Sequence, residues 1–334
     1  MHYIVVGAGA IGCYIGGCLT AAGCKVSFIG RPRVIEVLRG GLHLTALDGR
    51  DARVPAAAFT AAATVNELAL SPDEEITVLL CVKGGATLEA AREIAAALAA
   101  GTPVLSLQNG VDNVARIRAA APTLAAIAAM VPFNVTQPAP GHVHRATSGV
   151  LRAERNAWTE KLGADFAAAG LPLRLEADMR AVQWGKLLLN LNNPVNALSG
   201  LPLRDELRQR DYRRVLAALV EEALAALKAA GIAPAKVSGA PPALLPAILR
   251  LPDWLFRIVA APMLRIDPAA RSSMWDDLQA GRITEIDDLC GAVTRLAALH
   301  GIATPCNTTL IGLMAGADHS TRYAGAQLRA ACAP

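Results

Sequence analysis

The stretch VVGAGAIGCYIGG, residues 5–17, decides the fold that we predict for this chain. It begins inside the apolar run of residues 3–6 and continues into the segment 10–22, whose small residues suit a helix. A second apolar run, residues 25–29, follows. A strand, a glycine-rich turn, a helix and another strand in this order are typical of a βαβ unit that binds a dinucleotide.

The glycines of this turn fit the spacing G-x-G-x-x-G. Gly7 permits the tight turn, Gly9 lets a pyrophosphate approach the backbone, and Gly12 allows the helix to pack closely on the strand. The helix start adds free N–H groups and a positive dipole end. A glycine turn without a ligand is the alternative. We expect the dinucleotide to contact Gly7, Ala8, Gly9, Ala10, Ile11 and Gly12.

The end of the second strand indicates which dinucleotide binds. An acidic residue there would accept hydrogen bonds from the ribose hydroxyls of NAD, but this strand ends in FIGRPR, which places Arg31 at the position. A guanidinium suits a 2′-phosphate, and Arg33 can assist it. The alternative is a pair of solvated surface arginines. The sequence therefore predicts NADPH/NADP+ as the cofactor.

The rest of the first half alternates between strand and helix patterns. Apolar runs at 77–82, 103–107 and 125–133 predict strands, and the alanine-rich segment 88–100 predicts a helix between them. Alternation of this kind favours a parallel sheet covered on both faces. The segment 135–152 is rich in proline, glycine and polar residues, and we expect edge strands or loops there.

From about residue 178 the pattern becomes helical and strand signals nearly disappear. Helical periodicity runs through 178–199, 205–230, 271–299 and 304–315. A chain of 334 residues has a prior of two domains. The predicted fold is α/β: residues 1–176 form a Rossmann-type doubly wound parallel sheet, and residues 177–334 form an all-α domain.

Composition excludes several functions. The net charge is only +4, without a basic run, which argues against nucleic acid as a partner. The seven cysteines show no metal-binding spacing, so we expect no metal, and free thiols in a reducing cytoplasm. The apolar stretch 241–264 is interrupted by prolines and charges, which argues against a membrane span. We expect short helices there, over a core or at the contact of a homodimer.

Two apolar strands end in polar residues, Lys83 in LLCVKGG and Asn109 in LSLQNGV. In doubly wound sheets ligands bind beyond the carboxyl ends of the strands. We therefore expect both residues to line the site for cofactor and substrate. The alternatives are an ordinary surface charge for Lys83 and an Asn-Gly turn for Asn109.

The helix WGKLLLNLNNPVNALSG, residues 184–200, carries polar residues among its leucines. At about 100° per residue, Asn190 lies about 40° and Asn193 about 20° from Lys186, so these residues form one polar stripe. Burying such groups without partners would cost about 1–3 kcal/mol each, and a ligand is the simplest reason to keep them. A hydrogen-bond network between helices is the alternative.

Other residues of this helix lie off the stripe. Asn196 is about 80° and Asn192 about 120° from Lys186 on the helical wheel. Pro194 cannot donate to the carbonyl of Asn190, so we expect a kink there.

The stretch RSSMWDDLQAGRITEID, residues 271–287, holds the last group of candidates. We expect Ser273 and Glu285 on neighbouring turns of a helix pair interrupted near Gly281. Ordinary helix capping or solvent exposure is the alternative. The full set of candidates is Arg271, Ser272, Ser273, Asp277 and Glu285.

The motifs GAGAIG, VKGG, QNG, WGKLLLN and SSMWDDLQAGRITEID occur in the same order as in the 2-dehydropantoate 2-reductase (ketopantoate reductase) family, which the chain resembles over most of its length. The resemblance implies a Rossmann-type domain, a helical domain and an active site in the cleft between them. It also implies NADPH-dependent reduction of a small 2-ketoacid, 2-dehydropantoate, to pantoate, a step of pantothenate and coenzyme A synthesis.

Residue by residue, the resemblance implies that Lys186 is the catalytic lysine and that Glu285 is the acidic residue beside it. The resemblance further implies that Asn190 contacts the hydroxyl of the substrate and that Ser273 contacts its carboxylate. Lys83 and Asn109 resemble the pair where nicotinamide and substrate meet. The glycine turn and Arg31 resemble the clamp for NADPH.

The chain departs from the family on the substrate side. Many relatives read K-x-x-x-N-x-x-x-N-P, whereas here Pro194 stands in place of the second asparagine, and Asn193 can substitute for it. The proline-rich segment 234–268 is also longer than in compact members. The alternatives are therefore a reductase of another branched 2-ketoacid, a non-catalytic NADPH sensor and an opine-type dehydrogenase.

Overall fold

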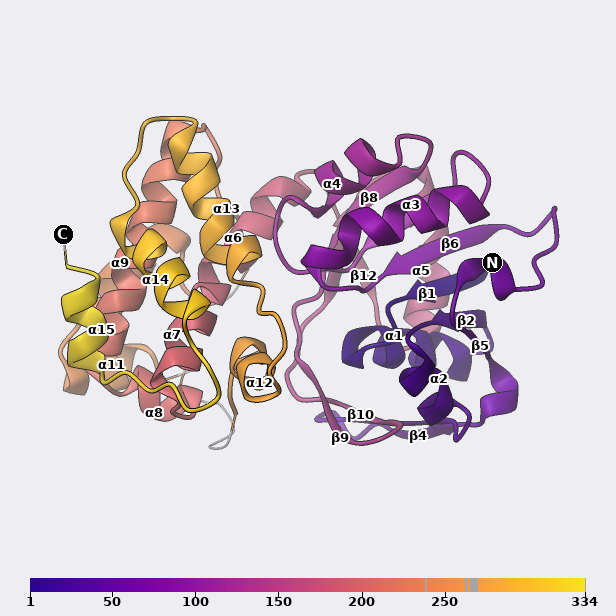
Figure 1. The fold of residues 1–334 in the computed structure, drawn as a ribbon, viewed down its shortest axis with the longest axis horizontal. Coiled ribbons are helices and arrows are strands. Elements are labelled where there is room, and N and C mark those ends of the chain that lie inside the picture. The colour runs from indigo at the N-terminus through magenta and orange to yellow at the C-terminus, as the bar shows by residue number, and fades with distance from the viewer. Residues whose placement is uncertain (238, 262–263, 265–269, 334) are drawn as a thin grey trace. The chain divides into compact units, whose positions relative to one another are not determined.

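The computed structural model describes residues 1–237, 239–261, 264 and 270–333 (Figure 1). The chain divides into two compact units, Met1–Met179 and Arg180–Pro334. The first is an α/β unit and the second a helical unit. The predicted fold class, a Rossmann-type α/β domain followed by an all-α domain, is confirmed.

The α/β unit is built on an eight-stranded sheet of order β12-β11-β8-β7-β6-β1-β2-β5. All neighbours in it are parallel except β8 and β11. The chain moves from β1 to β2 on one side and later returns to β6 on the other, so the strand order reverses at β1. The strands are β1 (His2–Val6), β2 (Lys25–Ile29), β5 (Thr60–Ala62), β6 (Ile76–Leu80), β7 (Pro103–Ser106), β8 (Ala125–Met130), β11 (Leu151–Glu154) and β12 (Leu173–Glu176).

Helices cover both faces of this sheet, as predicted. In β1, Tyr3 and Val5 join one hydrophobic cluster, whereas Ile4 and Val6 join another. This alternation buries the strand on both faces, which explains its continuous apolar sequence. The first cluster includes residues of α1 and α5, and the second includes residues of α3 and α4. The helices are α1 (Ala10–Ala21), α2 (Pro32–Leu38), α3 (Thr87–Ala97), α4 (Asn113–Ala120) and α5 (Ala157–Ala168).

A second, four-stranded sheet of order β4-β3-β10-β9 packs against α1. The residues of β3 alternate between buried and half-buried, typical of a sheet with one covered face. We predicted edge strands or loops for 135–152, where β9, β10 and β11 lie, but no strands at 42–54. The strands of this sheet are β3 (Leu42–Ala46), β4 (Asp51–Val54), β9 (Val135–Ala139) and β10 (His142–Arg145).

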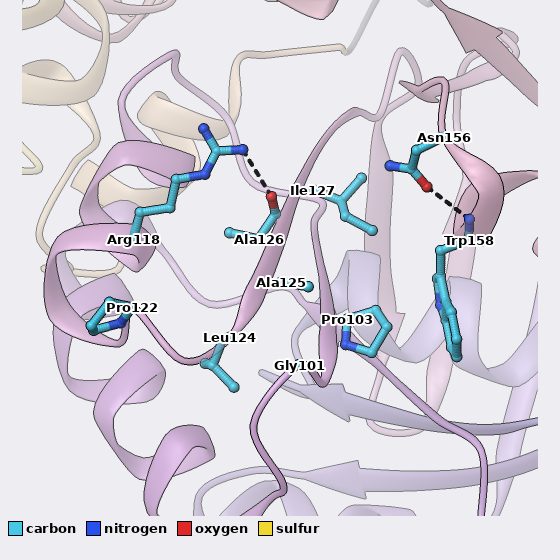
Figure 2. Close-up of a pocket in the computed structure, with 10 residues that line it drawn as sticks. All are labelled: Gly101, Pro103, Arg118, Pro122, Leu124, Ala125, Ala126, Ile127, Asn156 and Trp158. Carbon is cyan, nitrogen blue, oxygen red and sulfur yellow. Dashed lines mark hydrogen bonds between the residues drawn. The ribbon is translucent and has the colours of Figure 1, made fainter.

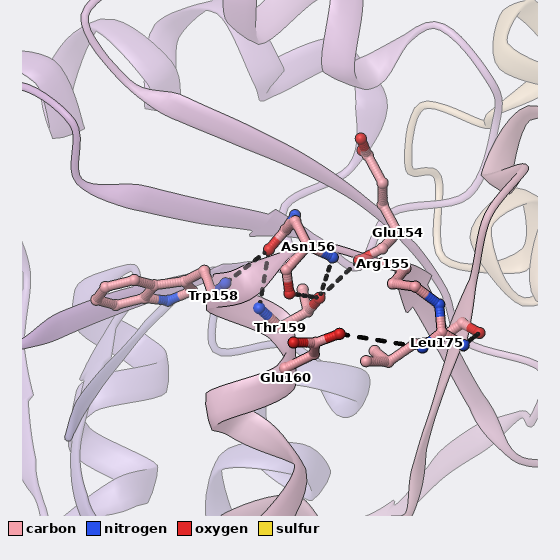
Figure 3. A network of polar contacts seen from close by, with 7 residues as sticks. All are labelled: Glu154, Arg155, Asn156, Trp158, Thr159, Glu160 and Leu175. Carbon is pink, nitrogen blue, oxygen red and sulfur yellow. Dashed lines mark hydrogen bonds and ion pairs between the residues drawn. The ribbon is translucent and has the colours of Figure 1, made fainter.

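The start of α5 is fixed by a capping box, drawn in Figure 3. The Asn156 side chain accepts hydrogen bonds from the backbone N–H groups of Trp158 and Thr159, and the Thr159 hydroxyl accepts one from the Asn156 backbone. The guanidinium of Arg155 donates to the carbonyl of Leu175 at 3.2 Å. The chain leaving β11 is thereby tied to β12 at the edge of the sheet.

The helical unit packs around α9, a helix of 20 residues. Its described helices are α6 (Met179–Asn190), α7 (Asn192–Ser199), α8 (Leu203–Leu207), α9 (Arg210–Ala229), α10 (Leu245–Arg250), α11 (Asp253–Val259), α12 (Ser273–Gln279), α13 (Ile286–Ala298), α14 (Pro305–Ala315) and α15 (Gly325–Ala331).

Two long helical patterns of the sequence are interrupted. The pattern 178–199 forms α6 and α7, separated at Leu191, and the expected break next to Pro194 is confirmed. The pattern 271–299 forms α12 and α13, with Gly281 at φ 61° between them. The sequence therefore located both breaks from one proline and one glycine.

The apolar stretch 241–264 forms short helices, as predicted: a 3-10 turn at Pro242–Leu244, then α10 and α11. Residues 238, 262, 263 and 265–268 of the proline-rich segment 234–268 lie outside the described residues. Within the described part of the chain, no helix is long and apolar enough to cross a membrane.

Candidate active site

The glycine loop connects β1 to α1 at the point where the strand order reverses. Gly7 donates to the carbonyl of Ile29 at 3.0 Å, and Cys81 donates to the carbonyl of Val6 at 2.8 Å. The loop is thus tied to the carboxyl ends of β2 and β6. Gly7 has a φ of 101°, and a Cβ there would lie 2.6 Å from the backbone nitrogen of Val82.

The other two glycines have different surroundings. A Cβ on Gly12 would lie 2.3 Å from the carbonyl oxygen of Gly7, so the helix can approach the loop only without a side chain. A Cβ on Gly9 would meet no atom within 4 Å. Gly9 is exposed and precedes α1, whose first turn has no side-chain cap. The open backbone and uncapped N–H groups fit a pyrophosphate.

Arg31 follows β2 and stands immediately before α2. A Cβ on the preceding Gly30 would lie 3.1 Å from the Cβ of Ala8, so this turn and the glycine loop are close neighbours. The side chains of Arg31 and Arg33 are exposed, and neither forms an ion pair or hydrogen bond with a described residue. Their charges are therefore available to an anionic group bound at the loop.

A buried polar network joins the ends of β6 and β7. The amide of Gln108 donates to the carbonyl of Val82 at 2.9 Å and to the hydroxyl of Thr87 at 2.7 Å. The Thr87 hydroxyl donates to Asn113, whose amide donates to the carbonyl of Asn109 at 2.6 Å. The network holds the segments that carry Lys83 and Asn109 at one edge of the sheet. Sequence reasoning missed Gln108, although it directly precedes Asn109.

The two predicted residues at this edge differ in exposure. Lys83 is exposed and precedes a 3-10 turn, Gly84–Ala86. Asn109 is half-buried and precedes Gly110, which has a φ of 93°, so the Asn-Gly turn considered from the sequence is present. Both follow the carboxyl ends of neighbouring parallel strands.

On α6 and α7, the residues of the polar stripe differ in exposure from the apolar residues around them. Lys186, Asn190 and Asn193 are all partly accessible. By contrast, Trp184 and Leu188 are 3% and 1% exposed, and so belong to the core. Backbone from another segment covers α6 at Gly185, where a Cβ would lie 2.1 Å from the carbonyl of Ala235.

Among the cationic side chains of α6 and α7, Lys186 has the pKa that departs most from its ordinary value. Burial lowers the pKa of its amine to about 8, and burial alone accounts for the shift. Its amine forms no ion pair or hydrogen bond with a described residue. Glu285, the acidic residue that the resemblance places beside this lysine, does not contribute to the shift in this conformation. A lysine whose pKa lies near neutral pH can release a proton at physiological pH.

The remaining asparagines of α7, Asn192 and Asn196, are buried and form hydrogen bonds within the helical unit. Asn196 is 0% and Asn192 8% exposed, and both amides donate to the Oε2 atom of Glu206, at 2.8 Å and 3.3 Å. For these two residues the alternative considered from the sequence, a network between helices, describes the structure. Sequence reasoning missed Glu206, and no pattern in its own helix points to it.

The start of α12 is attached to α7. Ser272 caps α12 by accepting from the backbone of Trp275, donates its own N–H to Asn196 Oδ1 at 2.9 Å, and donates its hydroxyl to the carbonyl of Asn193 at 3.2 Å. Ser273, the next residue, is exposed. Glu285 is half-buried and directly precedes α13, where its carbonyl accepts from Asp288 and Leu289.

The other chemical features lie elsewhere. A cavity of about 480 Å³ is lined by Pro103 and Ala125, the first residues of β7 and β8 (Figure 2). It therefore lies at the amino ends of these strands, whereas the glycine loop follows the carboxyl end of β1. There Arg118 donates to the carbonyl of Ala126 at 3.1 Å. All seven cysteines are free thiols. Among the described residues, no cluster of His, Cys, Asp or Glu is arranged to hold a metal ion.

A glycine loop at the switch point of a doubly wound sheet, followed by a helical unit with a perturbed lysine, defines the class of nicotinamide-dinucleotide-dependent oxidoreductases. Comparison with family models gives the particular family. The model described as ketopantoate reductase PanE/ApbA matches residues 3–157, and the corresponding C-terminal model matches residues 178–318. The chain belongs to the ketopantoate reductase family, as the resemblance implied, and is an oxidoreductase.

Individual relatives agree with this assignment. The chain is 27% identical over 322 residues to the 2-dehydropantoate 2-reductase of Halobacterium salinarum, covering 94% of this chain and 98% of that protein. A ketopantoate reductase of the PanE/ApbA family from Ralstonia eutropha has a crystal structure with a TM-score of 0.79 and 32% identity, covering 94% and 97% of the two chains.

A structure of D-mandelate dehydrogenase with NADH and anilino(oxo)acetate has a TM-score of 0.75, covers 94% of this chain and 97% of that one, and is 21% identical. At that identity the likeness shows a shared fold.

Proposed function

We propose that this enzyme reduces 2-dehydropantoate to (R)-pantoate with NADPH, in pantothenate and coenzyme A biosynthesis, and that Lys186 is the general acid. The observation that carries the proposal is the accessible stripe of Lys186, Asn190 and Asn193, in which burial lowers the lysine pKa to about 8. The curated relatives that match 94% of this chain are named 2-dehydropantoate 2-reductases.

NADPH is the proposed cofactor because of the second strand. The glycine loop offers uncapped N–H groups to the pyrophosphate, and Arg31 offers a charge to the 2′-phosphate. Arg31 occupies the position where an acidic residue would favour NAD. Lys83 and Asn109, at the carboxyl ends of the next strands, are proposed to contact the nicotinamide end of the cofactor.

The nicotinamide, when bound, supplies the hydride that reduces the ketone carbon. Lys186 stabilises the negative charge that develops on the carbonyl oxygen and then transfers its proton to that oxygen. With a pKa of about 8, most of the amine is protonated at pH 7, yet the proton leaves readily. Low water content around this amine strengthens its attraction to the developing alkoxide.

Substrate orientation is assigned to polar groups beside the lysine. Asn190 and Asn193 donate to the hydroxyl and carbonyl oxygens, and Ser273 donates to the carboxylate. Asn109 is proposed to contact the substrate as well as the cofactor. Glu285 is proposed as an acidic partner of Lys186 that acts once substrate is bound, since it does not shift the lysine pKa in this conformation.

A second candidate is the reduction of another branched 2-ketoacid. It is favoured by Pro194, which removes one asparagine of the family pattern. Pro194 is buried within α7, whereas Asn193 is partly accessible. Replacing the family's second asparagine with Pro194 therefore changes the proposed substrate contacts and does not change the glycine loop that is proposed to bind the cofactor.

The test is the loss of NADPH absorbance with purified protein and 2-dehydropantoate, beside NADH and a panel of smaller 2-ketoacids. We expect NADPH-selective turnover of 2-dehydropantoate. In Arg31→Ser the KM for NADPH should rise roughly 10-fold or more, with the KM for NADH nearly unchanged, because a charged hydrogen bond is lost. Faster turnover of another ketoacid would favour the second candidate, and NADPH binding without any turnover would contradict both.

A further inference from the structure

Glu206 of α8 is a carboxyl group in an unusual setting. Its side chain is 0% exposed, and its Oε2 atom accepts from the amides of Asn196 and Asn192. It forms no ion pair with a described residue. A buried carboxylate without a cation is normally too costly to keep ionised.

Two acceptor atoms in this group have no donor. Glu206 Oε1 and Asn192 Oδ1 are both buried, and neither has a hydrogen-bond partner among the described residues. An ionised carboxylate provides no donor, so both atoms would remain unsatisfied. One proton on Oε1 would turn that oxygen into a donor, and Asn192, whose amide already donates to Oε2, carries the unpartnered acceptor Oδ1 on the same side-chain amide.

We propose that Glu206 is held as the neutral carboxylic acid, and that it is a positioning residue for the start of α12 and for the α7 turn that carries Asn193. The substrate side of this inference rests on the proposed function, because Asn193 and Ser273 are proposed substrate contacts.

The connection runs through Asn196. Its amide donates to Glu206 and to the carbonyl of Leu201, and its Oδ1 accepts from the backbone of Ser272. Ser272 caps α12 and donates to the carbonyl of Asn193. The Leu201 carbonyl and the Ser272 N–H fix which way the Asn196 amide faces, and Glu206 accepts from that amide and from the amide of Asn192. Those amides hold the residues adjacent to both proposed substrate contacts.

The charged surroundings agree with a neutral acid. Burial raises the pKa of Glu206 to about 8, against the opposing hydrogen bonds from Asn196 and Asn192. From α9, Tyr212 faces it and donates to the carbonyl of Tyr323, while Arg213 donates to the carbonyls of Leu207, Leu249 and Leu251 and to Asp253.

Several other charged groups on the packed elements have described partners of their own, but the Nε atom of Arg204 does not. On α8 itself, Asp205 and Arg208 pair with each other at 3.7 Å, and Arg204 has a buried Nε without a described partner. Beside α12, Arg271 donates to the carbonyl of Gly200, and Asp277 pairs with Arg282.

Glu222 of α9 provides a matched control. It accepts from the backbone N–H groups of Cys306 and Asn307 and from the Asn307 amide, at 2.7, 2.9 and 2.7 Å. Both carboxylate oxygens of Glu222 thus accept from described donors, so an amide at this position would oppose a donor with a donor. Glu206 accepts from two amides at Oε2 and has an unpartnered Oε1, a pattern that the amide of glutamine can reproduce with one acceptor and one donor, as a neutral acid does.

The experiment compares Glu206→Gln with Glu222→Gln in the full-length protein. At pH 7, Glu206→Gln should match or exceed the parent Tm, because an amide cannot ionise in the unfolded chain, whereas Glu222→Gln should lower the Tm by roughly 4 °C or more. The folded pKa of Glu206 lies above its unfolded value, so its contribution to stability is complete below about pH 4.5 and is lost as pH rises through about 8. The fall of Tm between pH 6 and pH 9 should therefore shrink in Glu206→Gln.

Infrared difference spectra between pH 6 and pH 9.5 test the protonation directly. We expect the carbonyl band of a protonated carboxyl in the parent and its loss in Glu206→Gln. A positioning role is tested with Glu206→Ala, which should raise the ketoacid KM about 5-fold or more, leave the KM for NADPH unchanged, and regain the parent ketoacid KM when glutamine replaces alanine.

A Tm loss in Glu206→Gln equal to that in Glu222→Gln, or the absence of the infrared band, would overturn the neutral acid. An unchanged ketoacid KM in Glu206→Ala would overturn the positioning role. Failure of the proposed function is distinguishable, since the Tm and infrared measurements need no substrate and the KM comparison uses whichever ketoacid the parent reduces.

Discussion

The glycine loop and the α6–α7 helix pair both offer polar groups to ligands, but by different means. The loop offers backbone N–H groups, and its geometry depends on the absence of side chains at Gly7 and Gly12. The helix pair offers side chains, and its polar residues divide between an accessible face and a buried one.

The difference shows how far a local motif determines a site. Backbone groups of a turn point where the local dihedral angles direct them, so a short sequence is sufficient. An asparagine on a helix can meet a ligand or a neighbouring helix, and its face decides which. Asn193 and Asn196 are three positions apart, yet the first is partly accessible and the second is 0% exposed.

The largest effect is expected for Lys186→Met, which tests whether the accessible face is catalytic. Removal of the general acid should lower turnover about 100- to 10,000-fold, with little change in NADPH affinity. Steady-state rates and NADPH titration measure the two effects. Turnover within a few fold of the parent would refute the role of Lys186.

The same variant should become more stable at pH 7. The folded pKa of Lys186 lies below its unfolded value, so folding is penalised fully below about pH 8, where the buried amine must carry its charge, and the penalty disappears as pH rises towards the unfolded pKa. Removing the amine should add on the order of 2 kcal/mol to the free energy of unfolding, measured by urea denaturation. Loss of stability together with loss of activity would instead indicate that Lys186 has a structural role.

Substitution of the glycines separates binding from folding within the loop. Gly9→Ala should fold with the parent Tm, because its Cβ meets no atom, but should bind NADPH roughly 10-fold more weakly, because the Cβ occupies the approach of the pyrophosphate. Gly12→Ala should destabilise the fold, because its Cβ would lie 2.3 Å from a backbone oxygen. Thermal melts and NADPH titration distinguish the two, and equal Tm losses would contradict this assignment.

The smallest effects separate the two faces of α6 and α7. Asn196→Ala removes one of the two donors to Glu206 and the acceptor of the Ser272 N–H, and should cost about 1–3 kcal/mol of stability in chemical denaturation. Asn193→Ala and Asn190→Ala should cost less stability and raise the ketoacid KM several-fold. Equal losses of stability in all three variants would contradict the assignment of the accessible face to substrate binding and of the buried face to folding.

Much of the fold was predictable because its signals are local. The apolar runs of β1, β2, β6, β7 and β8 are buried on both faces, which requires continuous hydrophobic sequence. The second sheet at 42–54 was not predicted, because its short alternating strands are defined by pairing with β10 from far along the chain.

By itself, the sequence determined the glycine loop, Arg31 after the second strand and the break beside Pro194, since each depends on a few consecutive residues. Only the tertiary structure decided which asparagines of α6 and α7 are buried. It also decided that Glu206 meets Asn192 and Asn196, and that burial lowers the pKa of Lys186. These properties arise from desolvation and from hydrogen bonds between helices, and both depend on segments that are distant in sequence.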